Sequence, residues 1–283
     1  MKLPFQIDLK DKVAVVTGGG GVLCGEFAKA IAACGAKVAI LDLRKEAADQ
    51  VADEINADGG IAMGVAANVL DRESLETAKK EVNDAFGPIS ILINGAGGNN
   101  PRGTTTKEYY EKGDEALEGI TSFFNLDPQG VEFVFNLNFL GTLLPTQVFA
   151  LDLIDAKDPV ILNVSSMNAY TPLTKIPAYS GAKAAISNFT QWLAVHFSKV
   201  GIRVNAIAPG FLLTNQNKAL LVNEDGTYTE RSNKILSQTP MGRFGEKEEL
   251  IGALLFLLSA DAASFVNGVV IPVDGGFSAY SGV

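Results

Sequence analysis

Short runs of Val, Ile and Leu alternate with helical patterns along most of the chain, and this alternation limits the fold more than any other feature. The runs lie at residues 12–16, 37–41, 61–66, 89–94, 159–164, 202–208 and 268–273. Strands that are apolar almost throughout are typical of a parallel sheet with helices on both faces. We therefore predict an α/β fold, a doubly wound parallel sheet of about seven strands, in a single domain spanning residues 1–283.

Two long polar segments interrupt this alternation. They cover about residues 98–130 and 210–245, and the sequence has no internal repeat or linker. Long irregular insertions in a compact domain are usually lids or binding loops. We expect these two insertions to form the substrate side of a site at the edge of the sheet.

The charge balance and the scarcity of Cys and His exclude several classes of function. The net charge of −9 argues against nucleic-acid binding, and neither a signal-peptide core nor a Lys/Arg-flanked apolar run of membrane-spanning length is expected. Cys24 and Cys34 stand ten positions apart on one expected helix, about 15 Å along its axis, which is too far for a disulfide. We expect a cytoplasmic protein. The single histidine, His196, allows no His-rich zinc site, so no metal is expected, and His196 itself fits a surface or packing position.

The stretch TGGGGVLCG, residues 17–25, joins the first expected strand to an alanine-rich helix. Such a turn directs backbone N–H groups and the helix dipole at a pyrophosphate, and a flexible turn is the alternative. The cofactor contacts expected here are Gly18, Gly20, Gly21, Val22 and Leu23. The sequence leaves open whether Gly21 or Val22 faces the phosphates.

Asp42 ends the second expected strand, 42 − 21 = 21 residues beyond Gly21. A carboxylate about 20 residues after the glycine turn accepts hydrogen bonds from the adenosine ribose of NAD and repels the 2′-phosphate of NADP. Arg44 is the competing observation, because a cation there favours NADP. We predict NAD as the cofactor rather than NADP.

Tyr179 and Lys183 are four residues apart and share one face of an expected helix. A nearby ammonium stabilises phenolate, so we expect Lys183 to lower the pKa of Tyr179 and make it a general acid or base for a hydroxyl or ketone. The strand ending in NVSSMN brings Ser166 to the carboxyl edge of the sheet, where ligands bind in such folds. A surface Tyr–Lys pair is the alternative.

At these residues the sequence resembles the short-chain dehydrogenase/reductase family over nearly its whole length. That family carries Asn, Ser and Tyr-x-x-x-Lys in its active site, and Ser166 stands at its usual interval, 179 − 166 = 13 residues before Tyr179. FNLNFLGT resembles the helix with the family's Asn, here Asn138, and PVDGG at 272–276 resembles its C-terminal signature.

The resemblance implies a Rossmann-type fold and a set of cofactor contacts beyond the glycine turn. LINGAG resembles the family's NNAG element and implies cofactor contacts from Asn94, Ala96 and Gly97. APGFLLT resembles the family's PGxxxT element and implies Pro209, Gly210 and Thr214 at the nicotinamide carboxamide. Asn68 and Val69 are implied at the adenine. Ser166 would bind the reacting oxygen, Tyr179 would donate or accept its proton, and Lys183 would hold the nicotinamide ribose. Asn138 would position a water, and a homotetramer is expected from the family.

Two positions depart from the family pattern TGxxxGxG. Val22 and Cys24 stand where its second and third glycines are expected. Asn68 stands where an Asp normally binds the adenine amino group, and its amide oxygen retains the acceptor without the charge.

A narrower resemblance concerns the substrate. The sequence resembles the D-mannonate oxidoreductase (fructuronate reductase) branch of the family in the stretches TGGGGVLCG, GAGGNNPRGTT, TPMGRFGEKEEL and the ending VDGGFSAYSGV. This implies NAD(H)-linked interconversion of D-fructuronate and D-mannonate, with Asn99, Asn100 and Ser166 at the hydroxyls. Arg102 is the candidate partner of the substrate carboxylate, because a guanidinium binds carboxylates through two hydrogen bonds; a solvent-facing arginine is the alternative. Other functions kept open are a dehydrogenase for another polyol, a gluconate-like sugar acid or a 3-oxoacyl substrate, and a non-catalytic dinucleotide-binding sensor.

Overall fold

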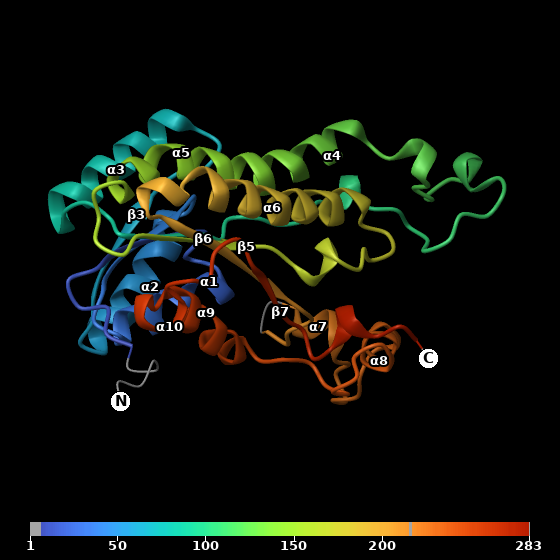
Figure 1. Cartoon of the computed structure of the whole chain (residues 1–283). Coiled ribbons are helices and arrows are strands. Elements are labelled where there is room, and N and C mark those ends of the chain that lie inside the picture. Colours follow the sequence, from blue (N-terminus) through green and yellow to red (C-terminus); the bar gives the residue numbers. More distant parts are fainter. Residues whose placement is uncertain (1–6, 215–216, 283) are drawn as a thin grey trace.

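In the computed structural model, which describes residues 7–214 and 217–282, the chain forms one parallel sheet of seven strands. The strands are β1 (Val13–Thr17), β2 (Lys37–Asp42), β3 (Ile61–Ala66), β4 (Ile91–Asn94), β5 (Val160–Val164), β6 (Arg203–Pro209) and β7 (Val270–Val273). Their order is β3-β2-β1-β4-β5-β6-β7, so the strand order reverses between β1 and β4. Figure 1 shows this sheet between two layers of helices. The predicted Rossmann-type sheet is confirmed, and each of the seven apolar runs predicted as strands overlaps one.

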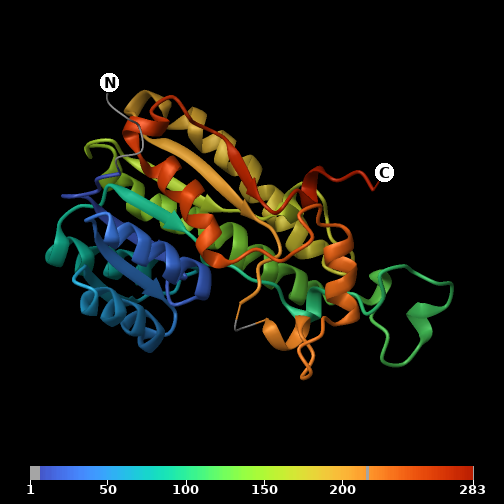
Figure 2. The ribbon, with the colours of Figure 1, turned by 90° about the horizontal axis from the view of Figure 1, so that it is seen from below.

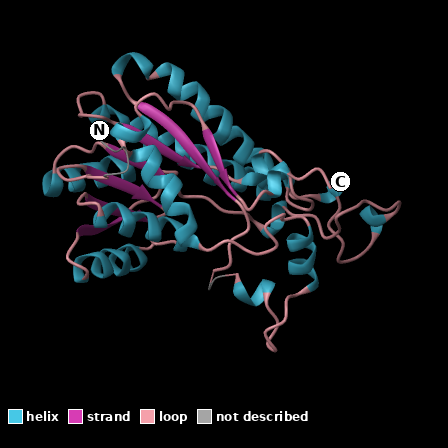
Figure 3. Cartoon of the chain, turned by 60° about the horizontal axis from the view of Figure 1, so that its bottom comes forward, coloured by secondary structure: helices cyan, strands magenta, loops and turns pink. Residues whose placement is uncertain are grey.

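Helices cover both faces of the sheet (Figure 3). They are α1 (Val22–Ala33), α2 (Lys45–Ala57), α3 (Arg72–Phe86), α4 (Pro128–Phe135), α5 (Gly141–Leu153), α6 (Pro177–His196), α7 (Lys218–Leu221), α8 (Glu230–Ser237), α9 (Ile251–Leu258) and α10 (Ala260–Ala263). Side chains of α1, α2 and α9 pack on one face, and those of α3, α5 and α6 pack on the other.

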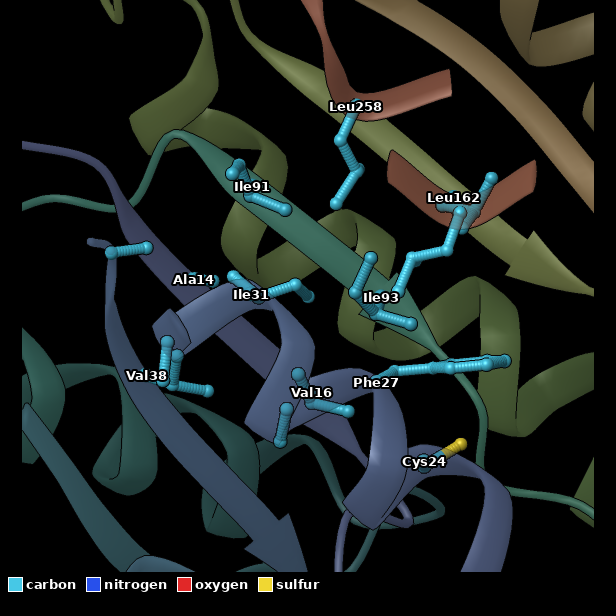
Figure 4. Close-up of a cluster of buried hydrophobic side chains, with 14 of the residues drawn as sticks. Ala14, Val16, Cys24, Phe27, Ile31, Val38, Ile91, Ile93, Leu162 and Leu258 are labelled. Atoms are coloured by element: carbon cyan, nitrogen blue, oxygen red, sulfur yellow. The ribbon is translucent and has the colours of Figure 1, made fainter. Parts of the chain in front are cut away.

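The strict alternation of strand side chains creates the two cores. In β1, Ala14 and Val16 point to the α1 face while Val13 and Val15 point to the opposite face. Figure 4 shows the first core, in which Phe27 of α1 extends across the strands. Each large apolar side chain buried in this way stabilises the fold by about 1.5–3 kcal/mol.

The helices α4 and α5 run on through a π-helical turn, Asn136–Leu140, as one helix from Pro128 to Leu153. By length and composition this helix could cross a membrane, which the sequence patterns did not indicate. Half of its apolar window is buried within the protein, as expected for a core helix of a folded domain. Its length instead carries the chain from the first insertion to the far end of the sheet.

The two polar insertions both lie at the end of the molecule to which the strands point. We call residues 98–127 the arm and residues 217–245 the lid. The arm projects beyond the body and contains three 3₁₀ turns, Pro101–Gly103, Asp114–Ala116 and Phe123–Asn125 (Figure 2). The lid contains α7 and α8 and has a small core of its own, built around Leu221, Ile235 and Phe244.

Candidate active site

A cavity of about 530 Å³ opens at the carboxyl edge of the sheet, where the loops after β1 and β4 diverge. Ligands of doubly wound sheets bind at this reversal of strand order. The residues that line the cavity include Gly18, Gly21, Val22, Leu23, Cys24, Asp42, Asn68, Val69, Ala96, Gly97, Gly210, Thr214 and Asn217. Most of the cofactor contacts expected from the sequence are thus brought together here.

The glycine turn after β1 is built on close backbone approaches. Gly18 has φ +64, and a Cβ there would lie 2.8 Å from Ala96 Cα. The N–H of Gly21 donates to Gly18 O at 3.0 Å, and Gly21 is the N-cap of α1. Val22 is the first helical residue and lines the cavity beside Gly21. The N–H groups of the first turn have no partner within the helix, so this end of α1 fits an anion such as a pyrophosphate.

Asp42 is held in place by the glycine turn. Its Oδ2 accepts a hydrogen bond from Gly20 N at 3.2 Å, and its Oδ1 accepts one from Arg44 N at 3.0 Å. A Cβ on Gly20 would lie 2.9 Å from Asp42 Oδ2 and 2.7 Å from Ala47 Cβ, so only glycine fits there. Gly20 therefore seats the carboxylate that lines the cavity, and the site fits a group with free hydroxyls such as a ribose.

Cys24, one of the departures from the family pattern, is buried against Gly95. A Cβ on Gly95 would lie 2.1 Å from Cys24 Sγ, so the thiol occupies the space that the missing side chain leaves. Burial raises the pKa of the Cys24 thiol to about 12, which makes it a packing group rather than a nucleophile. This pairing was not visible in the sequence, because the two residues are far apart along the chain.

Asn94 has a side chain that ties the sheet together and does not line the cavity. Its Nδ2 donates to Thr146 Oγ1 and to Asn163 Oδ1, both at 2.9 Å. The neighbouring loop is fixed by Thr17 Oγ1, which accepts from Gly95 N at 3.1 Å and Ala96 N at 3.3 Å. The glycine-rich segment after β4, Gly95–Gly97, lines the cavity in place of Asn94.

Two further segments complete the cavity wall. Asn68 Oδ1 accepts from Leu70 N at 3.0 Å, which leaves one lone pair of that oxygen for a ligand. A Cβ on Gly210 would lie 2.5 Å from Asp274 Cα, so these two backbone segments are in close contact. Pro209, just before Gly210, is the last residue of β6. Thr214 N donates to Asn217 Oδ1 at 2.8 Å, so Asn217 is a lining residue that the motifs did not indicate.

The expected catalytic residues gather at the ends of β5 and α6. Ser166 follows β5, and Tyr179 lies in the first turn of α6, where its hydroxyl is hydrogen-bonded to Ser166. Lys183, one turn further on, is buried, donates from Nζ to Val164 O at 2.9 Å and lies 5.6 Å from the centre of the Tyr179 ring. This arrangement places a phenol, a hydroxyl and an amine at one point.

The pKa of Tyr179 departs from the sequence-based expectation. Burial raises the pKa of Tyr179, and the hydrogen bond with Ser166 lowers it only in part. Burial also lowers the pKa of Lys183 to about 8, because the charged ammonium loses solvation. Lys183 is not among the groups that lower the pKa of Tyr179, so the expected lowering by Lys183 is not found in this structure, and Tyr179 is a protonated phenol at neutral pH.

Asn138 is fully buried in the π-helical turn, and its side chain holds the loop after β4. Its Oδ1 accepts from Gly98 N at 3.2 Å, and its Nδ2 donates to Gly98 O at 2.8 Å and Val134 O at 2.7 Å. The side chain is thus already engaged with backbone. A Cβ on Gly97 would lie 2.6 Å from Asn138 Oδ1 and 3.2 Å from Lys183 Nζ, so this loop packs directly on two catalytic candidates.

The expected substrate residues Asn99, Asn100 and Arg102 lie at the base of the arm and outside the lining of the cofactor cavity. Asn99 Nδ2 donates to Thr104 Oγ1 at 3.1 Å, and Asn100 Oδ1 accepts from Arg102 N at 2.9 Å. The Arg102 guanidinium bonds Asp127 Oδ2 at 2.5 Å and Gln129 Oε1 at 2.9 Å. Arg102 is half-exposed and fastens the arm to the start of α4.

A doubly wound sheet with a dinucleotide-type cavity beside Ser, Tyr and Lys defines an oxidoreductase of alcohols and ketones. The family model described as short chain dehydrogenase matches residues 12–225, and the chain belongs to that family. It is a dehydrogenase acting on alcohol groups, as its family relatives are.

Relatives and solved structures extend this likeness over the whole chain. An uncharacterized oxidoreductase of Haemophilus influenzae is 60% identical over 100% of this chain and 99% of its own. A crystal structure of a proposed D-mannonate oxidoreductase from Haemophilus influenzae with bound NAD is also 60% identical, covers 100% of both chains and has a TM-score of 0.94. A gluconate 5-dehydrogenase from Burkholderia cenocepacia, in complex with NADP and tartrate, is 26% identical over 98% of both chains, with a TM-score of 0.82.

Proposed function

We propose that this protein is an NAD(H)-dependent dehydrogenase that interconverts D-fructuronate and D-mannonate. The observation that carries the proposal is the hydrogen-bonded pair Ser166 and Tyr179 next to a cavity whose far end presents Asp42. The bound NAD and the name of the 60% identical solved structure support the choice of cofactor and substrate. The substrate class would also account for the polar insertions at this edge of the sheet.

The residues present fit a nicotinamide dinucleotide. The first turn of α1 would hold the pyrophosphate, Asp42 the adenosine ribose, and Gly210 and Thr214 the nicotinamide carboxamide. When bound, the cofactor supplies or takes up the hydride. NAD rather than NADP is proposed because the carboxylate of Asp42 repels a 2′-phosphate.

In the reducing direction, the side chains of this chain handle the oxygen and its proton. Ser166 would donate a hydrogen bond to the ketone oxygen, and Tyr179 would give its phenolic proton to that oxygen as it gains negative charge. The raised pKa of Tyr179 keeps this proton in place at neutral pH. Lys183 would then stabilise the phenolate, and Asn138, whose side chain bonds the loop after β4, would position a water.

The cofactor and substrate are tested together by assaying the wild-type protein on a panel. D-Fructuronate, 5-keto-D-gluconate, a neutral ketose and a 3-oxoacyl thioester are each assayed with NADH and with NADPH. We expect the highest kcat/KM for D-fructuronate with NADH. A higher value for the gluconate-type ketone would favour the neighbouring specificity, and tight NADH binding without any turnover would revive the sensor hypothesis.

Arg102 remains the proposed partner of the substrate carboxylate, although it bonds Asp127 in this structure. Two substitutions separate the roles. If Arg102 binds the carboxylate, Arg102→Ala raises KM for sugar acids but spares neutral polyols, and Asp127→Asn, which releases the guanidinium, does not raise KM. If Arg102 only fastens the arm, both substitutions raise KM alike for acids and polyols, which would remove Arg102 from the substrate site.

We propose further that the protein is a cytoplasmic homo-oligomer, a tetramer by its family resemblance. The proposed cytoplasmic location is supported by Cys24 and Cys34, which are both free thiols. The support for assembly is an apolar groove of about 410 Å³ between α5 and α6. It is lined by Leu143, Leu151, Ile154, Phe189, Trp192 and Phe197, among others.

A further inference from the structure

The arm and the lid are far apart in the sequence and meet at one ion pair. Lys234 Nζ, on α8 of the lid, donates a hydrogen bond to Glu108 Oε2 of the arm. This bond raises the pKa of Lys234 and lowers the pKa of Glu108, so both groups stay charged at neutral pH. Figure 2 shows the lid, in orange, beside the base of the arm, in green.

On the lid side, the ion pair stands on a packed unit. Ile235, the residue after Lys234, is buried with Leu221 and Phe244 in the core of the lid. Ser232 Oγ donates to Leu221 O at 2.6 Å, which ties α8 to α7. Because α8 is packed into the lid in this way, holding Lys234 in place holds the whole lid rather than one side chain.

On the arm side, the ion pair belongs to a segment that is hydrogen-bonded to the loop before α6. Thr105 N donates to Lys175 O at 2.8 Å, and Lys175 is four residues before Tyr179. Thr106 N donates to Thr121 O at 2.8 Å and joins the two limbs of the arm. The charge of Lys175, in the loop that leads into the helix of Tyr179, also lowers the pKa of Glu108.

We propose that Glu108 and Lys234 form a latch that holds the lid closed over the bound substrate. The lid begins at Asn217, which lines the cofactor cavity, so an open lid exposes that cavity to water. Neither latch residue lines the cavity, and both act as positioning residues.

The latch also has a charge role, which rests on the proposed function. A sugar acid entering between arm and lid is repelled by a free Glu108 carboxylate, and Lys234 cancels that charge. Losing Lys234 therefore harms the binding of an anionic substrate more than losing the Glu108 charge does.

Hydrogen exchange measured by mass spectrometry tests the latch without any substrate. The variants are Glu108→Gln, Lys234→Met and the exchanged pair Glu108→Lys with Lys234→Glu; the control is Asp84→Asn, which removes the exposed Lys80–Asp84 pair of α3. We expect α8 amides to exchange about two- to fivefold faster in both single variants, as fits an exposed ion pair. The control should keep the wild-type rate, and the exchanged pair should recover part of it, because Lys175 repels a lysine at position 108 and Glu230 repels a glutamate at position 234. Unchanged exchange in the single variants, or no recovery in the exchanged pair, would overturn the latch.

Steady-state kinetics tests the charge role. For a sugar acid, Lys234→Met should raise KM more than Glu108→Gln, with kcat reduced by less than KM is raised. For a neutral polyol that the wild type accepts, the two substitutions should raise KM equally. Equal effects on the acid would contradict the charge role. If no sugar acid is turned over at all, the proposed function fails, while the exchange experiment still decides the latch.

Discussion

Tyr179 carries the chemistry in the proposed reaction, because its hydroxyl is the proton donor hydrogen-bonded to Ser166. Tyr179→Phe removes that proton and leaves the ring in place. We expect NADH binding within about twofold of the wild type and a kcat lower by about 10²–10⁴-fold, the usual contribution of general acid–base catalysis. Fluorescence titration with NADH and single-turnover assays measure the two quantities. A variant that keeps most of its turnover would show that Tyr179 is not the acid.

Lys183 gives a pH dependence whose sign follows from its burial. Its pKa falls from 10.5 to about 8 in the folded protein, so between these values the unfolded chain binds more protons. Stability contributed by this group therefore rises with pH from about 8 to 10.5, by about 3 kcal/mol in total. Urea unfolding should show that the free energy of unfolding of the wild type rises relative to that of Lys183→Met over this pH range. If the difference in free energy of unfolding between the two proteins does not change with pH, burial does not lower the pKa of Lys183.

At the residue scale, spacing alone predicted which types of side chain would gather, but not what they bond. Ser166, Tyr179 and Lys183 could be placed from the sequence because a strand end and one helix face bring them together. The contact of Cys24 with Gly95 and the bonds of Asn138 to Gly98 depend on how separate loops pack, which no local pattern encodes. The direction of the Tyr179 pKa also required its burial to be known.

The loop after β4 is the element whose packing most directly limits the site. Gly97→Ala places a methyl group 2.6 Å from Asn138 Oδ1 and 3.2 Å from Lys183 Nζ, so one of these must move. Gly98→Ala is the matched control, because its Cβ meets only Leu137 Cδ2, at 3.7 Å. We expect at least a roughly tenfold lower kcat for the first variant, as misplaced catalytic groups cost activity steeply, and near-normal kcat for the second. Equal kcat values in two folded variants would show that this contact does not matter.

The strands and helices of the sheet were predictable as elements, whereas the arm and the lid were predictable only as insertions. Periodicity identifies a strand or helix because its own residues decide its buried face. The arm is shaped by contacts such as Lys107 with the buried Asp114, and by the bond of Arg102 to Asp127 25 residues later. Such pairings within irregular segments leave no periodic signal, so the partner of Arg102 was not foreseen.

For the whole molecule, the apolar groove between α5 and α6 is a feature that the single chain leaves uncovered. Leu151, Trp192 and Val195 are 62%, 55% and 76% exposed on this side of the molecule, and His196 stacks on Trp192 with ring centres 4.5 Å apart. Exposed apolar patches of this kind mark interfaces, and the proposed occupant is a second copy of the chain. His196 is thus a packing residue of this surface.

Replacing Leu151 by Glu tests whether copies of the chain associate through this groove. A carboxylate that becomes buried without a partner costs about 3–5 kcal/mol, which weakens association at least about a hundredfold. We expect light scattering after gel filtration to give a smaller mass for Leu151→Glu than for the wild type. The control is Phe265→Glu, because Phe265 is a fully exposed aromatic outside the groove and should leave the mass unchanged. A monomeric wild type would refute the proposed assembly, and an unchanged mass for Leu151→Glu would move the interface to another face.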